Sequence, residues 1–150
     1  MAGRRGGGSQ GARGLARRRA MQALYQWQLT GQAAKDIVLQ FADDPEHERA
    51  DHELFRELVR ESIEHHEDLD ASIAELSDRA VAQLDPVEHA ILLIGIYELA
   101  HRQDVPYRVV INEAVELCRV FGAEEGHKFV NALLDRAAHR LRAAEIAAAG

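Results

Sequence analysis

The segment LDPVEHAILLIGIYELAHR, residues 84–102, constrains the fold of this chain more than any other stretch. Asp85 is suited to cap a helix, Pro86 suits the first helical position, and Glu88 follows three residues after the cap. The rest of the predicted helix is apolar on nearly every side, and a helix of this kind is usually the buried centre of its domain. We therefore expect other helices to surround this one.

Six further segments have apolar residues that recur every three or four positions, as they do on one face of a helix. These segments cover residues 15–30, 37–41, 55–63, 69–80, 106–122 and 124–142. A break near residues 68–70 separates two of them, and the segment ADDPEHERA, residues 42–50, is predicted to be an acidic loop. Because no segment keeps the alternation of a strand, we predict an all-α fold of about seven helices.

The predicted helices are flanked by two terminal segments that are not predicted to pack against the core. Residues 1–14 hold six glycines among arginines and polar residues, a composition typical of disorder. Residues 144–150 are predicted to be a frayed tail. A hydrophobic share of 47% is enough to build a core without disulfides or metals. We therefore predict a single helical domain over residues 15–143.

Charge is distributed unevenly along the chain, whose net charge is -7. Seven of the 18 basic residues lie in residues 1–35, and all 25 acidic residues follow them. This asymmetry predicts a polyanionic partner for the basic end and a basic partner for the acidic body. The alternative for the body is an acidic surface that only keeps the protein in solution.

Metal binding and catalysis have little support in the sequence. His47 and His52 are five residues apart, which misses the spacing that places two zinc-binding imidazoles on one helix face. Cys118 lies on an apolar stripe and is predicted to be a buried structural residue rather than a nucleophile. No pairing of a nucleophile with a base is evident. We therefore expect no metal, no cofactor and no enzymatic activity.

The sequence also lacks the marks of membrane insertion and secretion. Its longest apolar run, residues 90–97, is far too short to span a bilayer. The basic start is not followed by the apolar region of a signal peptide. A single cysteine suits a reducing compartment. We predict a cytoplasmic protein that makes no membrane contact.

The basic block at residues 17–19 runs directly into the first predicted helix. At 3.6 residues per turn, one stripe of this helix presents a guanidinium, an amide and a phenol, which suit phosphates, base edges and base faces. The residues of this stripe are Arg18, Gln22, Tyr25 and Leu29. The opposite face, marked by Leu24 and its neighbours, is predicted to be buried. The alternative is that Tyr25 is packed and Arg18 is only solvated.

The segment FGAEEGHKFVNALLD is a second candidate for anion binding. Gly122 ends one predicted helix and the next begins at once, so free backbone N–H groups favour an anion there. Lys128 and Asn131 add donors one and two turns into that helix. Glu125 and the preceding glutamate would repel a phosphate. The alternative is that these glutamates are ordinary residues of a helix start.

Two segments carry a resemblance to a known family. They are RRRAMQALYQWQLTG and YELAHRQDVPYRVVINEAVELCRVFGAEEGHKFVNALLDRAA, and with their spacing the chain resembles the NusB family over residues 12–138. The resemblance implies two packed three-helix bundles plus a short helix, and transcription antitermination without enzymatic activity. It implies binding to boxA RNA of ribosomal RNA transcripts together with NusE, a small-subunit ribosomal protein. The complex then joins RNA polymerase with other Nus factors.

The resemblance also implies roles for individual residues. It assigns RNA binding to residues in the basic block, on the first helix and in the second candidate segment. These residues are Arg13, Arg17, Arg18, Arg19, Gln22, Tyr25, Gly122, Glu125, Lys128, Phe129 and Asn131. It assigns a NusE contact to Glu88, whose charge suits a basic partner. Leu93 departs from the family, whose members often carry arginine there.

Two other functions and the oligomeric state stay open. The first alternative is a protein–protein scaffold whose RNA contacts come from its partner. It also has some likeness to the helical RNA-binding domain attached to rRNA cytosine methyltransferases. Some members of the NusB family form homodimers, and the sequence does not decide between a monomer and a homodimer.

Overall fold

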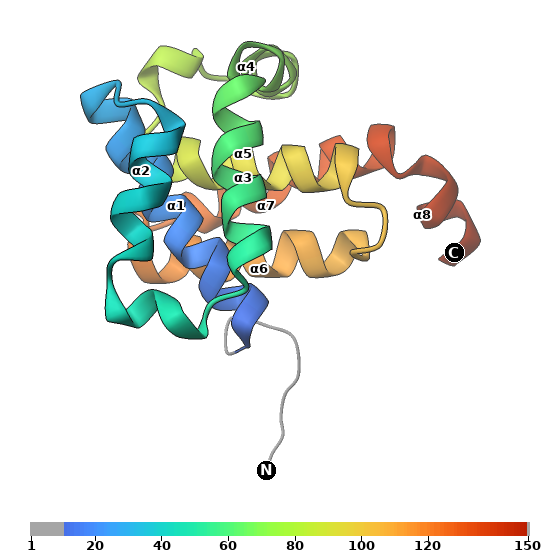
Figure 1. The fold of residues 1–150 in the computed structure, drawn as a ribbon. Helices are drawn as coiled ribbons and strands as arrows, with labels where there is room; N and C mark the ends of the chain where they lie inside the picture. The colour runs from blue at the N-terminus through green and yellow to red at the C-terminus, as the bar shows by residue number, and fades with distance from the viewer. Residues whose placement is uncertain (1–10, 150) are drawn as a thin grey trace.

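A computed structural model describes residues 11–149, which form eight α-helices and two short 3-10 helices (Figure 1). No strand occurs within this range, so the predicted all-α class is confirmed. The elements in chain order are α1 (Ala12–Thr30), α2 (Ala34–Ala42), η2 (Pro45–Arg49), α3 (His52–Glu64), α4 (His66–Leu76), η3 (Val81–Gln83), α5 (Pro86–His101), α6 (Tyr107–Phe121), α7 (Gly126–Leu141) and α8 (Ala143–Ala149).

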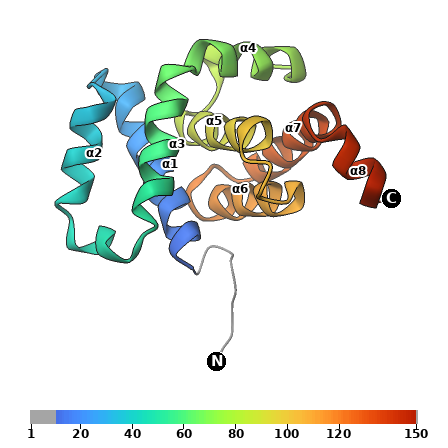
Figure 2. The same cartoon turned by 45° about the vertical axis from the view of Figure 1, so that its right-hand side comes forward.

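The long helices form two groups of three that share one core. α1, α2 and α3 pack against one another, and so do α5, α6 and α7. α1 also packs along α5 and touches α6, so it joins the two groups. α4 contacts α5 and α7, and α8 extends away from the end of α7 (Figures 1 and 2). This arrangement agrees with the two three-helix bundles that the family resemblance implies.

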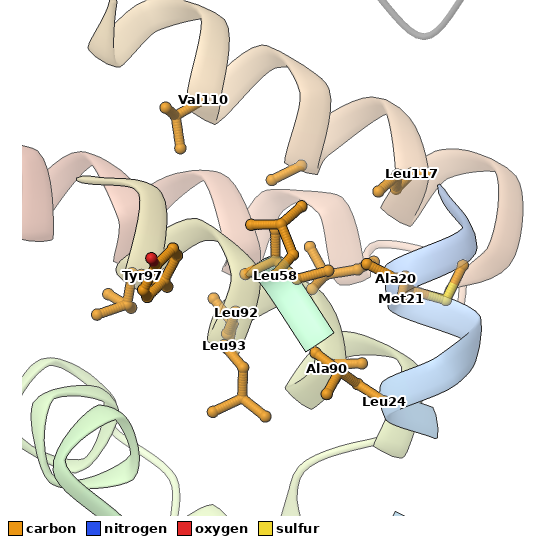
Figure 3. Close-up of a cluster of buried hydrophobic side chains, with 14 of the residues drawn as sticks. Ala20, Met21, Leu24, Leu58, Ala90, Leu92, Leu93, Tyr97, Val110 and Leu117 are labelled. Carbon is orange, nitrogen blue, oxygen red and sulfur yellow. The ribbon is translucent and has the colours of Figure 1, made fainter. Parts of the chain in front are cut away.

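Helix α5 lies at the centre of the molecule, as its apolar sequence predicts. Eleven of its 16 residues are buried, and side chains from α1, α3 and α6 gather around it (Figure 3). The Asp85 side chain caps the helix by accepting hydrogen bonds from the N–H groups of Val87 and Glu88. Leu93 is fully buried, so the position at which the family often carries arginine belongs to the core of this chain.

The first helix begins at Ala12, three residues earlier than predicted. Its first turn is held because the Asp51 N–H at the start of α3 donates to the Ala12 carbonyl oxygen at 3.0 Å. Arg13 also lies 3.9 Å from carboxylates of both Asp51 and Asp104. The predicted disordered arm is therefore wrong for residues 12–14, and residues 1–10 lie outside the described range.

The predicted frayed tail is a helix, α8, and the sequence interpretation of residues 144–149 is wrong. Arg142 is buried before α8 and donates to the carbonyl oxygens of Glu98, Leu99 and Arg102 at the end of α5. Its guanidinium also pairs with Glu145, and the Glu145 carboxylate accepts a hydrogen bond from the N–H of Tyr107. The tail is therefore joined to the end of α5 and the start of α6.

Several other segments also differ from their predicted positions. The break between α3 and α4 falls at His65 rather than at residues 68–70. The predicted acidic loop contains η2, because the Asp44 side chain accepts a hydrogen bond from the N–H of Glu46 and caps a short turn. Helix α7 begins at Gly126, two residues later than predicted.

We predict that Arg142→Ala lowers the free energy of unfolding by about 3 kcal/mol, because it leaves buried carbonyl groups and a carboxylate without their donor. Chemical denaturation followed by circular dichroism measures this loss. The matched control is Arg140→Ala, which removes only an exposed pair with Glu75 and should change stability by about 0.5 kcal/mol or less. Equal losses in the two variants would contradict the structural role of Arg142.

Candidate nucleic-acid interface

The first arginine of the basic block, Arg17, faces the interior. Its Nε and Nη2 atoms donate to the two carboxylate oxygens of Glu98 on α5 at 2.8 and 2.9 Å. Its Nη1 atom lies 3.6 Å from Glu113 on α6, and the residue is 3% exposed. Burial raises the pKa of the Glu113 carboxyl, and the Arg17 charge opposes that shift. The donors of Arg17 are therefore paired in the core, and an RNA contact by this residue stays a prediction.

Arg19 faces α2 and is 6% exposed. Its guanidinium lies over the Phe41 ring at 4.7 Å and pairs with Asp44 at 3.1 Å and Glu46 at 3.4 Å. Two carboxylates therefore neutralise the one guanidinium, and little of it reaches solvent. The helix turns Arg19 toward the neighbouring acidic segment, and its predicted RNA contact stays a prediction.

Arg13 and Arg18 keep part of their side chains in solvent. The Arg18 side chain is 40% exposed, and its only nearby carboxylate within residues 11–149 belongs to Glu46 at 3.9 Å. Arg13 lies at a similar distance from two carboxylates at the start of α1. Weak pairs of this kind leave the guanidinium available to a stronger anion such as phosphate.

The predicted stripe of α1 faces outward, and we call Arg18, Gln22, Tyr25 and Leu29 the α1 ridge. Tyr25 and Leu29 are exposed, whereas Arg18 and Gln22 are half-buried. Tyr25 is 38% exposed, and its hydroxyl makes no hydrogen bond to residues 11–149. On the opposite side of the helix Ala20 and Leu24 are fully buried (Figure 3). The prediction of two faces on one helix is confirmed, and the alternative of a packed Tyr25 is wrong.

The turn between α6 and α7 has an unusual backbone at Glu125. This residue adopts the left-handed conformation, with φ 71°, and immediately precedes α7. Its carboxylate pairs with the Lys128 Nζ atom at 2.6 Å, and both side chains are well exposed. Gly122 ends α6 as predicted. The lysine that was expected to attract an anion is therefore partly neutralised by the glutamate that was expected to repel one.

Phe129 and Asn131 lie further along α7. Asn131 is exposed, whereas the Phe129 ring is half-buried and is covered by the Arg79 guanidinium at 3.9 Å. Arg79 belongs to the loop between α4 and α5, and no sequence pattern pairs it with a residue fifty positions away. Any ligand that stacks on Phe129 must also meet this guanidinium.

Glu88 is 4% exposed and points toward the first residue of α7. A side chain at Gly126 would collide with its carboxylate, so this glycine permits the close approach of α5 and α7. Burial raises the pKa of the Glu88 carboxyl, the nearby Asp85 adds to the shift, and Arg79 opposes it. A direct contact between Glu88 and a basic partner stays a prediction, and the structure does not present this carboxylate openly.

The start of α5 connects the α1 ridge to the turn before α7. The Gln28 side chain on α1 donates to the Pro86 carbonyl oxygen at 2.9 Å, and its amide oxygen lies 3.2 Å from the His89 ring. Two residues after Pro86, Glu88 lies against Gly126 at the start of α7. The α1 ridge and the predicted residues around the α6–α7 turn therefore lie on either side of the first turn of α5. Both views place the α6–α7 turn near α1 (Figures 1 and 2).

The described residues offer no sign of metal or membrane chemistry. Within residues 11–149 no three His, Cys, Asp or Glu side chains are grouped so as to hold a metal ion. No helix in this range is long and apolar enough to cross a membrane. Cys118 is buried, as predicted, and burial together with the Glu88 charge raises the pKa of its thiol to about 11.

The chain is similar to proteins of one known family, in both its sequence and its structure. Residues 15–139 match the model of the NusB family. A transcription antitermination protein NusB from Xanthomonas axonopodis pv. citri is 47% identical over 148 residues, which cover 99% of this chain and 93% of that protein. The chain is also similar to a solved structure of T. maritima NusB, with a TM-score of 0.74, 29% identity, and coverage of 83% of this chain and 88% of that one.

A complex of antitermination factors is among the similar structures. It is a crystal structure of NusB and NusE in complex with dsRNA, with a TM-score of 0.67 and 26% identity. The similarity covers 81% of this chain and 92% of that one. The solved relative therefore forms a complex with both a protein and an RNA partner.

We predict that Arg17→Ala lowers the free energy of unfolding by about 3 kcal/mol, because two buried carboxylates lose their counter-charge. The neighbouring Arg18→Ala variant is the matched control and should cost about 0.5 kcal/mol or less, because its side chain is partly in solvent. Urea denaturation of the two variants measures the difference. A larger loss in Arg18→Ala than in Arg17→Ala would show that the inward and outward arginines are wrongly assigned.

Proposed function

The chain belongs to the NusB family of transcription antitermination proteins, and we propose that it binds boxA RNA of ribosomal RNA transcripts together with NusE. The observation that carries this proposal is the α1 ridge, where a partly exposed guanidinium, a half-buried amide and an exposed phenol stand in one line. The solved complex of a NusB with NusE and dsRNA supports both partners. In this proposal the protein works in the cytoplasm, where it supports rRNA transcription.

The residues of the α1 ridge divide the work of RNA recognition. Arg18, with Arg13 one and a half turns earlier, contacts phosphates, since a guanidinium binds phosphate oxygens with charged hydrogen bonds. Tyr25 stacks on a base, because unpaired RNA bases are commonly held by aromatic faces. Gln22 lies between them and can both donate to and accept from a base edge. Arg17 and Arg19 act indirectly, since they hold α1 in the orientation that exposes the ridge.

The residues around the α6–α7 turn extend the proposed surface. Asn131 is an exposed amide, and Lys128 becomes available to a phosphate if its pair with Glu125 opens. Phe129 offers its ring only together with Arg79, so this pair would stack as a unit. Gly122 acts through the backbone, because it ends α6 and sets the turn.

The acidic body suits the proposed protein partner. A small-subunit ribosomal protein binds ribosomal RNA and is expected to be basic, so the excess of carboxylates outside the α1 ridge favours its approach. We further propose that the pair joins RNA polymerase with other Nus factors, in the manner of the family. A homodimer that covers the α1 ridge would compete with this assembly.

We predict that Arg18→Ala weakens binding of a boxA RNA oligonucleotide about fivefold at low salt and lowers the slope of log affinity against log salt by about 0.7, as expected for one lost phosphate contact. Fluorescence anisotropy titrations over a salt series measure both values. Arg140→Ala, which removes an exposed arginine on α7, is the control and should leave both unchanged. An unchanged slope in Arg18→Ala would rule out the phosphate contact.

The same titration with and without NusE tests the scaffold alternative. If the protein binds boxA RNA alone and NusE raises the affinity, direct binding is supported. If RNA binds only when NusE is present and Arg18→Ala has no effect, the protein is a scaffold whose partner supplies the RNA contacts. Absence of RNA binding under both conditions would overturn the proposed function.

We predict that Glu88→Gln weakens NusE binding about fivefold if the Glu88 charge contributes to the interface. Glutamine keeps the shape beside Gly126, and stability should hold or rise, because burial already disfavours the ionised carboxyl. Glu88→Lys is a poorer test, because a longer cation would be forced between α5 and α7. Isothermal titration calorimetry with NusE measures the effect. Unchanged affinity would exclude an electrostatic contact by this residue.

A further inference from the structure

A groove between α1 and α2 borders the α1 ridge. Its volume is about 190 Å³, which is the size range of one nucleobase rather than a larger ligand. The groove is lined by Arg19, Gln22, Gln26, Gln40, Phe41 and Asp44. Three of these side chains are amides, so the lining is polar but carries few charges.

The floor of the groove is formed by Arg19 stacked on Phe41. The two Nη atoms of Arg19 are taken by Asp44 and Glu46, but its buried Nε atom has no hydrogen-bond partner. A buried donor without an acceptor costs free energy, and this atom is too deeply buried for a ligand in the groove to reach it. The guanidinium and the ring are both planar and both line the groove, so together they offer a small stacking surface.

The amides on the walls are positioned to read the edge of a planar ligand. The Gln26 amide nitrogen donates to the Gln40 amide oxygen at 2.9 Å, which fixes the orientation of Gln40 and leaves its own N–H groups free. The Gln22 amide makes no hydrogen bond to residues 11–149. An amide both donates and accepts, as the Watson–Crick edge of a base requires.

The charges around the groove favour a neutral ligand over a phosphate. Asp44 and Glu46 stand beside Arg19, and the hydrogen bond from the Glu46 N–H helps to hold the pKa of Asp44 below its usual range. Two ionised carboxylates against one guanidinium repel a phosphate at this position. The exposed Arg18, one residue away on the α1 ridge, is better placed to hold the phosphate of the same nucleotide.

We propose that the α1–α2 groove is a base-binding subsite, which takes one unpaired RNA base against the Arg19–Phe41 pair and reads it with Gln22 and Gln40. This inference rests on the proposed RNA-binding function, because the strand must lie along the α1 ridge for a base to reach the groove. Gln22 belongs to both the ridge and the groove, so the two are continuous. The strand bends one base away from the ridge, while its backbone stays beside Arg18.

The test combines protein variants with a panel of boxA RNA oligonucleotides, each of which lacks the base at one position. For the unmodified protein, one abasic position should lower the affinity about tenfold, the range expected for loss of a stacked base. Gln40→Ala should weaken binding of intact RNA about fivefold and add no further loss at that same position. Gln40 is exposed, so the variant should fold normally. Gln83→Ala, at an exposed amide on η3, is the matched control and should leave the whole panel unchanged.

A second variant tests whether the free N–H groups of Gln40 contact the base. Gln40→Glu retains the oxygen that accepts from Gln26 but removes the free N–H groups, so it should weaken the same RNA position at least as strongly as alanine. If the protein binds boxA RNA and no position couples to Gln40, the groove takes no base and the proposal is overturned, while the proposed function stands. If Gln40→Ala lowers affinity for NusE and not for RNA, the groove is a protein contact. Failure of the unmodified protein to bind RNA would instead defeat the proposed function.

Discussion

The ion pair between Arg17 and Glu98 is the interaction on which the arrangement of the two helix groups depends. It joins α1 to α5 through two hydrogen bonds, and Glu113 brings α6 to the same guanidinium. Because all three groups are buried, loss of the arginine would leave two carboxylates without a counter-charge in the core. The same pair fixes the rotation of α1 about its own axis, since the side chain of Arg17 must point inward.

That rotation decides which residues reach the surface. Successive helix residues are about 100° apart, so an inward Arg17 turns Arg18 toward solvent and Arg19 toward α2. Gln22 and Tyr25 follow Arg18 at helical spacing and complete the exposed α1 ridge. Three consecutive arginines therefore have three different tasks: one closes the core, one faces solvent, and one forms the floor of a groove. A basic block in a sequence does not reveal this division.

The parts of the fold that depend on neighbouring residues could be predicted from the sequence, and the parts that depend on distant partners could not. Asp85 caps α5 through groups two and three residues away, and the apolar run that follows marks the central helix. The outward stripe of α1 follows from its spacing alone. By contrast, the carboxylate that buries Arg17 is 81 residues away. Helix α8 was missed for the same reason, because Arg142 is held by carbonyl groups of α5.

The pairing of arginines within the protein changes the expected physics of RNA binding. Counted along the sequence, the first 35 residues are strongly basic, but the two buried guanidinium groups of the block are neutralised by the protein's own carboxylates. Few phosphate contacts then remain for counterion release, so the electrostatic part of the affinity from residues 11–149 is small. In the proposed binding mode, recognition relies more on stacking by Tyr25 and on amide hydrogen bonds, which distinguish one base from another. A ribosomal protein partner that supplies additional positive charge would then raise affinity without having to supply the sequence preference.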